Sequence, residues 1–404
     1  MNRTLAALLA AAGLALAAPG TATAATAWVA GWSVSPVVGS TIPGNTCPAG
    51  AGLTNQTVRN VVFLSAGGDH VRVRLTNTFG TRPLTVDHAS VAVQGNGATP
   101  AAGTLRELTF QGRRAVTVPA GAQEYSDPVS LRVAALSTLL VSAHVAGPTG
   151  PLTNHPFTAQ GNYLAGGDAT LAADSGRFGT TPCWMLADGV DVAPAAAVTG
   201  TVVAFGDSIT DTANTTGNAN HRWPDFLARR LAAQPGRTLS VANAGLGGNR
   251  VIADRPGQPY YGVAGVTRFQ RDALGVTGVR TVVLLEGVND IGYDATATAI
   301  IGGYRQMIAA AHARGVRIVG ATLTPFGGSA IDTPARRQTW QQLNDWIRHS
   351  GMFDGVVDFD AATADPADSF RLRPAYDSGD HLHPGDAGTQ AMANAVDLAT
   401  LLRN

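Results

Sequence analysis

Residues 28–192 alternate apolar and polar positions in short runs. The segment His70–Leu75 places every second side chain on one apolar face, which is typical of a strand with one solvated side. Turns rich in Gly and Pro, at 66–68, 95–97 and 119–121, separate the runs. Further strands are predicted at 58–64, 90–93, 115–118, 129–133 and 138–145. This spacing predicts an antiparallel β-sandwich or jelly-roll-like module over 28–192.

The pattern changes after an Ala- and Pro-rich segment at 193–199, which is predicted to be a linker. From there, continuous apolar runs alternate with segments of helical spacing. The predicted strands lie at 201–205, 238–242, 281–285, 316–321 and 355–358, and the predicted helices at 223–231, 300–313, 338–349 and 386–402. The alternation predicts an α/β domain over 200–404, with a parallel sheet covered on both faces.

Polar turns lie where ligands bind in such a domain, beyond the carboxyl ends of the strands. Gly206-Asp207-Ser208 follows the first strand, Asn243 to Arg250 the second, and Gly287-Val288-Asn289-Asp290 the third. Asp380-His381-Leu382-His383-Pro384 precedes the last predicted helix. We expect these four blocks to meet at one edge of the sheet.

The four blocks contain the residue types of a nucleophilic hydrolase. A serine such as Ser208 needs a base to become a nucleophile, and His383 is the best candidate, with Asp380 to orient it. A developing oxyanion needs fixed donors, which the N–H groups of Ser208 and Gly248 and the amide of Asn289 could supply.

This set resembles the SGNH hydrolases, also called the GDSL esterase/lipase family. The resemblance covers about residues 200–404 and implies a flavodoxin-like parallel sheet. It also implies Ser208 as nucleophile, His383 as base with Asp380 as its partner, and Gly248 and Asn289 as oxyanion donors. The lack of a Gly-x-Ser-x-Gly elbow around Ser208 fits this family rather than the α/β-hydrolases. A β-rich front half before such a domain looks like exported actinobacterial esterases and, less specifically, like carbohydrate esterases that carry a jelly roll.

Several assignments have alternatives. His381 lies two positions before His383, so spacing alone does not choose the base, whereas the family's Asp-x-x-His pattern favours His383. Gly247 is adjacent to the predicted donor Gly248. Arg250 and His221 are candidates for lining the substrate pocket.

A metal site is an alternative interpretation of the last block. The cluster of His381, His383, Asp377, Asp380 and Asp386 could bind a cation, but a cation site there leaves Ser208 and Asn289 unexplained, so we predict neither metal nor cofactor.

The N-terminus has the features of a secretory signal peptide over 1–27. Arg3 precedes an apolar run at 5–18, and small residues follow Pro19, with candidate cleavage sites after 24 and 27. A membrane anchor is the alternative, but the run is shorter than the ~20 residues that span a bilayer. Export would place Cys47 and Cys183, the only two cysteines, in an oxidising compartment, where we predict a disulfide rather than two separate thiols.

Composition excludes several other functions. The 404 residues carry 28 basic and 28 acidic side chains, a balance that argues against a nucleic-acid partner. Every basic residue is Arg, so a P-loop, a Schiff base and a Ser-Lys dyad are excluded.

The sequence therefore predicts a secreted serine esterase that acts through an acyl-enzyme, on short acyl or acetyl groups of a small-molecule or polysaccharide ester. The alternatives are a lipase or phospholipase for longer chains and a non-catalytic carbohydrate-binding protein. The front module has two readings, an inert packing unit or a substrate-shaping one.

Overall fold

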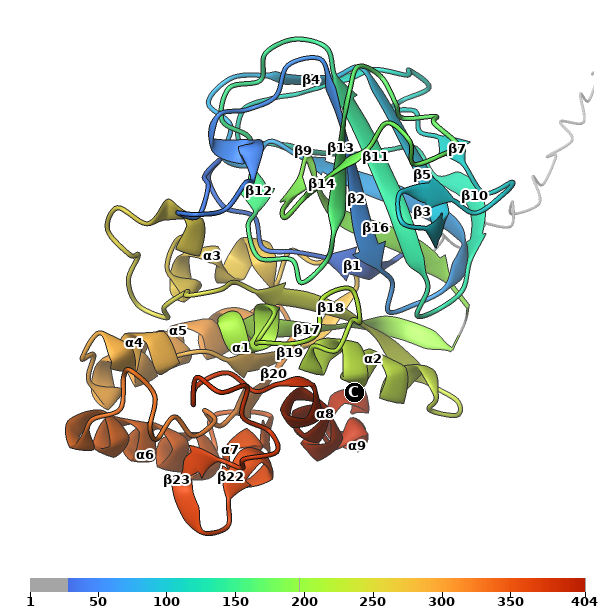
Figure 1. The fold of residues 1–404 in the computed structure, drawn as a ribbon. Helices are drawn as coiled ribbons and strands as arrows, with labels where there is room; N and C mark the ends of the chain where they lie inside the picture. The colour runs from blue at the N-terminus through green and yellow to red at the C-terminus, as the bar shows by residue number, and fades with distance from the viewer. Residues whose placement is uncertain (1–27, 196, 404) are drawn as a thin grey trace, which may run out of the picture.

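The computed structural model describes residues 28–195 and 197–403, which form two halves packed against each other (Figure 1). The signal peptide predicted at 1–27 lies outside the described residues. The first half ends with β16 (Ala187–Pro194) and the second begins with β17 (Val198–Gly206). The linker predicted at 193–199 thus shares residues with the ends of both strands. No helix within the described ranges is long and apolar enough to cross a membrane.

The first half is built from antiparallel strands around a common core. One sheet has the order β1-β16-β3-β10 with β9 beside β3, and a second has the order β14-β13-β2-β11-β5-β6 with β7 beside β5. The alternation at 70–75 is reproduced in β3, where Val71, Val73 and Leu75 are buried and the arginines between them are half-buried. The antiparallel β-rich module predicted from the sequence is therefore confirmed. The strands of these sheets are β1 (Val29–Ser33), β2 (Gln56–Phe63), β3 (Gly68–Thr76), β5 (His88–Asn96), β6 (Thr99–Pro100), β7 (Arg106–Glu107), β9 (Gln123–Tyr125), β10 (Val129–Val133), β11 (Thr138–Val145), β13 (Asn162–Gly166), β14 (Gly179–Thr181) and β16.

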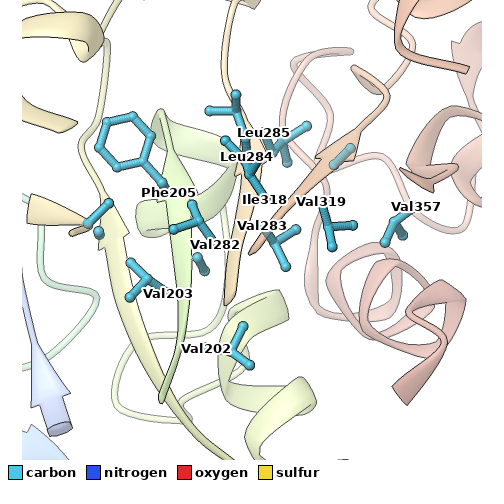
Figure 2. Close-up of a cluster of buried hydrophobic side chains, with 14 of the residues drawn as sticks. Val202, Val203, Phe205, Val282, Val283, Leu284, Leu285, Ile318, Val319 and Val357 are labelled. Atoms are coloured by element: carbon cyan, nitrogen blue, oxygen red, sulfur yellow. The ribbon is translucent and has the colours of Figure 1, made fainter. Parts of the chain in front are cut away.

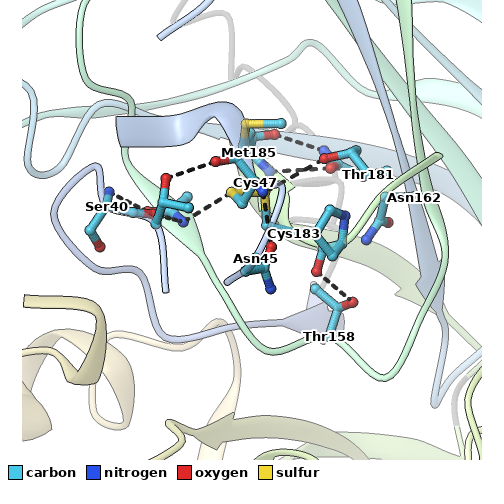
Figure 3. Close-up of a disulfide and its surroundings, with 12 residues drawn as sticks. Ser40, Asn45, Cys47, Thr158, Asn162, Thr181, Cys183 and Met185 are labelled. Carbon is cyan, nitrogen blue, oxygen red and sulfur yellow. Dashed lines mark hydrogen bonds between the residues drawn. A yellow bond between two sulfur atoms is a disulfide. The ribbon is translucent and has the colours of Figure 1, made fainter. Parts of the chain in front are cut away.

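Shorter strand pairs complete this half. β4 (Leu84–Val86) pairs with β8 (Val116–Val118), and β12 (Asn154–His155) pairs with β15 (Trp184–Met185). The second of these pairs lies beside the disulfide between Cys47 and Cys183 (Figure 3). The disulfide joins residues 136 positions apart, and both cysteines are buried.

The second half contains a parallel sheet with strand order β18-β17-β19-β20-β21. In chain order this is 2-1-3-4-5, the flavodoxin-like arrangement, so the predicted α/β fold is confirmed. Figure 2 shows the fully buried side chains of its central strands, among them Val203, Phe205 and Val283. Runs of branched apolar residues suit such strands because helices cover both faces. The remaining strands are β18 (Thr238–Gly245), β19 (Val279–Leu285), β20 (Arg317–Ala321) and β21 (Gly355–Val357).

Three of the four predicted helices, at 223–231, 300–313 and 338–349, are present, whereas the helix at Gly265–Asp272 was not predicted. The helix predicted at 386–402 is wrong, because the chain forms α8 (Asp386–Ala395) and α9 (Leu398–Leu402) instead. Val396 between them is extended, and the Asp397 carboxylate accepts the Ala399 N–H at 3.0 Å, which caps a new helix. The other principal helices are α2 (Trp223–Ala232), α3 (Gly265–Asp272), α5 (Ala297–His312) and α6 (Pro334–His349).

The two halves share hydrogen bonds along the edge strands β1 and β18. The Ala30 N–H donates to the Thr277 carbonyl at 3.1 Å, and the Val241 N–H donates to Ser65 Oγ at 2.9 Å. Buried polar contacts of this kind fix the orientation of the module on the α/β domain.

Candidate active site

Ser208 begins the short helix α1 (Ser208–Asp211), directly beyond the carboxyl end of β17. Asp207 caps this helix, because its Oδ1 accepts the Ile209 N–H at 3.0 Å. Gly206 permits the tight turn, since a Cβ there would lie 2.1 Å from the Leu285 carbonyl oxygen. The strand end thus places the Ser208 hydroxyl at the edge of the sheet.

The structure brings Ser208, His383 and Asp380 into one hydrogen-bonded chain. Ser208 Oγ lies 2.8 Å from His383 Nε2, and His383 Nδ1 lies 2.6 Å from Asp380 Oδ2. A carboxylate accepts the Nδ1 proton, which leaves Nε2 free to accept the proton of the serine. The arrangement has the geometry that general-base activation of a serine requires.

Asp380 is held ionised by its surroundings. Partial burial acts to raise its pKa, but the hydrogen bonds from the His383 and Leu382 N–H groups and from the His383 ring outweigh burial and lower the pKa to about 2. Asn214 Nδ2 adds a contact to Oδ2 at 3.1 Å. At neutral pH this carboxylate therefore remains a negative partner for an imidazolium.

Two backbone N–H groups near Ser208 are free to receive an oxyanion. Within the described residues, the N–H groups of Ser208 and Gly248 have no hydrogen-bond acceptor. The Gly247 N–H, by contrast, donates to Asp211 Oδ2 at 2.8 Å. This difference favours Gly248 over its neighbour as a donor. Gly248 has a φ of +71°, and a Cβ there would lie 2.3 Å from the Tyr261 ring.

Asn289 has a fixed amide. Its Oδ1 accepts from Arg255 Nη2 at 2.7 Å, and its Nδ2 donates to the Asn249 carbonyl at 2.9 Å. An amide nitrogen carries two hydrogens, so the second remains available for a substrate oxygen. The amide orientation is thus set before any substrate arrives, which is the property that oxyanion stabilisation needs.

Arg268 connects the strand ends beneath the site. It is fully buried and donates to the carbonyls of Gly206 and Ala244, each at 2.8 Å, and to Asn249 Oδ1 at 2.7 Å. Its charge lies 3.6 Å from the buried Glu286 carboxyl. Burial raises the pKa of Glu286 to about 8 and that of Asp207 to about 6, despite the favourable charge of Arg268.

The raised pKa of Glu286 predicts a pH-dependent stability. The folded protein holds a proton that the unfolded chain releases above the ordinary pKa of 4.5, so this group lowers stability as pH rises from 4.5 to about 8. Glu286→Gln removes that dependence. The free energy of unfolding of Glu286→Gln, measured in urea, should exceed that of the native protein by little at pH 5 and by progressively more toward pH 8. Parallel pH profiles for the two proteins would contradict the burial of a neutral Glu286.

Among the described residues, the other side chains proposed from the sequence make no hydrogen bond to Ser208 Oγ. His381 Nδ1 pairs with Asp377 Oδ2 at 2.5 Å, and His221 Nδ1 pairs with Asp386 Oδ2 at 2.7 Å. Arg250 stacks on Tyr293, with 4.5 Å from the guanidinium carbon to the ring centre. Across the described ranges, no group of three or more His, Cys, Asp or Glu residues is placed to hold a metal ion.

His155 and Phe157 of the first half contact residues of the site, and no local sequence pattern points to either. His155, at the end of β12, is buried, and its Nε2 lies 3.0 Å from Asp211 Oδ1. The same Asp211 accepts the Gly247 N–H. Burial acts to lower the pKa of His155, but the charge of Asp211 together with the hydrogen bonds to Asp211 and to the backbone outweighs burial and raises the pKa. Phe157 packs against Gly247, where a Cβ would lie 2.7 Å from its ring.

A flavodoxin-like sheet that carries this serine, histidine and aspartate beyond its strand ends defines an α/β hydrolytic domain of the SGNH type. In agreement, residues 204–391 match the family model of GDSL-like lipases and acylhydrolases. Residues 204–391 therefore form a domain of this family, and this domain is that of a carboxylic ester hydrolase.

Solved structures with similar folds include the native aryl esterase of M. smegmatis, with 15% identity, a TM-score of 0.40 and coverage of 48% of this chain and 95% of that one. A GDSL-like lipase from Bacteroides thetaiotaomicron has 19% identity and a TM-score of 0.36, over 50% and 88% of the two chains. A carbohydrate acetylesterase family member from Sinorhizobium meliloti has 16% identity and a TM-score of 0.39, over 48% and 94%. A search of curated proteins finds no match.

Proposed function

We propose that the protein is a secreted serine esterase that hydrolyses esters of short acyl groups, acetyl above all, through an acyl-enzyme on Ser208. The observation that carries the proposal is the continuous contact from Ser208 Oγ to His383 Nε2 and from His383 Nδ1 to Asp380, next to free oxyanion donors. Secretion is supported by the leader-like segment 1–27 and by the buried disulfide.

These contacts support a reaction in two stages, acylation of Ser208 and then release of the acid. Ser208 Oγ attacks the ester carbonyl while His383 Nε2 takes its proton, and Asp380 stabilises the imidazolium. The N–H groups of Ser208 and Gly248 and the amide of Asn289 hold the oxyanion. His383 then gives the proton to the leaving alcohol. A water molecule, activated by the same histidine, releases the acid and restores Ser208.

The expected preference for short acyl groups has a structural reason. Tyr293, an exposed side chain one helical turn after Asn289, stacks with Arg250 and Arg255, so cationic groups flank this apolar surface. A long acyl chain would require a continuous apolar path from the oxyanion donors.

One observation favours longer acyl chains as a second candidate. A cavity of about 390 Å³ is lined by Arg255, which contacts Asn289, and by the apolar residues Val38, Phe79, Pro259 and Val263. A series of 4-nitrophenyl esters from acetate to dodecanoate, run beside acetylated xylan and a triglyceride, separates the two. We expect kcat/KM to be highest for acetate to butyrate. A kcat/KM that rises with chain length would replace the proposal with a lipase.

Asn289→Ala should lower kcat for 4-nitrophenyl acetate by about 10²–10³, because removal of one preorganised oxyanion donor costs this much in hydrolases. KM should change less, since the donor acts mainly on the transition state. Near-native kcat in a folded variant would refute the role of Asn289. Circular dichroism and the urea midpoint serve as the folding control.

A further inference from the structure

An open groove lies between the two halves, beside the Ser208 helix. Its volume is about 430 Å³. Residues 156–161, with Asn45 and Pro182, line it from the first half, and residues between 212 and 218 line it from the second. Neither half forms the groove alone. This gives the β-rich module a place next to the reacting groups.

The groove adjoins the proposed catalytic residues at both ends. At one end, Phe157 packs against Gly247, beside the oxyanion donor Gly248. At the other end, Asn214 Nδ2 donates to Asp380 Oδ2 at 3.1 Å. Between them, the N–H groups of Thr212 and Ala213 donate to the Ser208 carbonyl at 3.1 and 2.6 Å. An alcohol that leaves on the histidine side of Ser208 would therefore enter this groove.

The walls of the groove are braced across the two halves. The Asn218 N–H donates to the Ala159 carbonyl at 2.8 Å, and the Gly161 N–H donates to Asn218 Oδ1 at 2.6 Å. Ala159 and Ala213 both have positive φ, at 47° and 46°, a costly conformation that concentrates at functional sites. The disulfide follows Asn45 by two residues and Pro182 by one, so it ties together two parts of the wall (Figure 3).

The lining has a definite chemistry. Every residue that lines the groove is uncharged, and the set combines the amides of Asn45, Gln160 and Asn218 with hydroxyls and the ring of Phe157. Amides and hydroxyls donate and accept hydrogen bonds with neutral hydroxyl groups, and an aromatic face packs on an apolar ring surface. A cationic alcohol would instead need a carboxylate or an aromatic cage.

We propose that this groove binds the alcohol part of the ester, and that the alcohol is neutral and rich in hydroxyl groups, such as a glycoside. This inference rests on the proposed function. It assigns the β-rich module a share in substrate selection, because that module supplies one wall of the groove.

Gly217 offers a way to obstruct the groove without changing the residues proposed for catalysis. A Cβ on Gly217 would meet open space, and its φ is not in the left-handed region. Gly217→Trp should raise KM for a methyl glucoside acetate at least about tenfold, a size typical of a blocked subsite. It should leave kcat/KM for 4-nitrophenyl acetate within about twofold, because the small aryl ester does not need the groove. Gly147→Trp is the matched control, since its Cβ also meets open space and its place is on the surface, outside the groove.

The outcomes separate the inference from the proposed function. Hydrolysis of 4-nitrophenyl acetate that requires Ser208 supports the function by itself. If that reaction occurs but the native enzyme prefers acetylcholine to the glucoside acetate, the inference is overturned and the function stands. Equal losses on both esters in Gly217→Trp, or none on either, also overturn the inference. Methyl glucoside should inhibit the native enzyme and the Gly147 variant, and Gly217→Trp far less.

Discussion

Ser208→Ala is expected to lower kcat for 4-nitrophenyl acetate by about 10⁴ or more, the scale of losses when a serine nucleophile is removed. The reason is that the acyl-enzyme cannot form without Oγ, which lies 2.8 Å from His383 Nε2. The remaining groups would leave only weak residual catalysis from the oxyanion donors and binding. The variant should fold normally, since the hydroxyl contacts only His383 among the described residues.

A matched serine on the surface tests whether the loss is specific. Ser130 lies on β10, and among the described residues its hydroxyl contacts only His70, 3.2 Å away. Ser130→Ala should keep the native kcat. If Ser208→Ala kept a tenth of the native activity, Ser208 would not be the nucleophile.

Asp380→Asn should cost about 10⁴ in kcat, because an amide nitrogen facing His383 Nδ1 favours the wrong tautomer of the ring. In that tautomer Nε2 carries the hydrogen and cannot take the proton of Ser208.

The pKa of Asp380, about 2, means that the carboxylate of the native protein stays ionised from pH 5 to 9. Protonation of Asp380 therefore does not shape the pH–rate profile in that range. Steady-state kinetics at several pH values measure the effect.

Asp377→Asn is the closest control that the chain offers. Asp377 accepts from His381 at 2.5 Å in the same way as Asp380 accepts from His383, but His381 has no contact with Ser208 among the described residues. We expect a change of less than about threefold in this variant. A loss in Asp377→Asn equal to that in Asp380→Asn would mean that His381 shares the role of base.

The parallel sheet and its polar strand ends could be predicted because both depend on local sequence. Buried strands have continuous apolar runs, and the turn after each run holds its polar residues at the same edge. The break between α8 and α9 was missed because residues 386–402 keep helical spacing, whereas the Asp397 cap depends on one side chain.

The contribution of the first half could not be predicted in the same way. His155 and Asp211 are 56 positions apart, and Arg268 contacts Ser35 across 233 positions. No periodic pattern links such pairs, because each partner is a single polar residue in an otherwise ordinary segment. The same holds for Phe157, whose position over Gly247 depends on how the two halves pack. The proposed oxyanion donors could be predicted from the family pattern, but the contacts that hold them required the structure.

The central claim is that Ser208 carries the acyl group, and a fluorophosphonate that labels active serines tests it most directly. After incubation of the native protein, peptide mapping by mass spectrometry should find one adduct, on the peptide that contains Ser208. Ser208→Ala should show no adduct under the same conditions. An adduct on any other residue, or inactivation without an adduct on Ser208, would contradict the account.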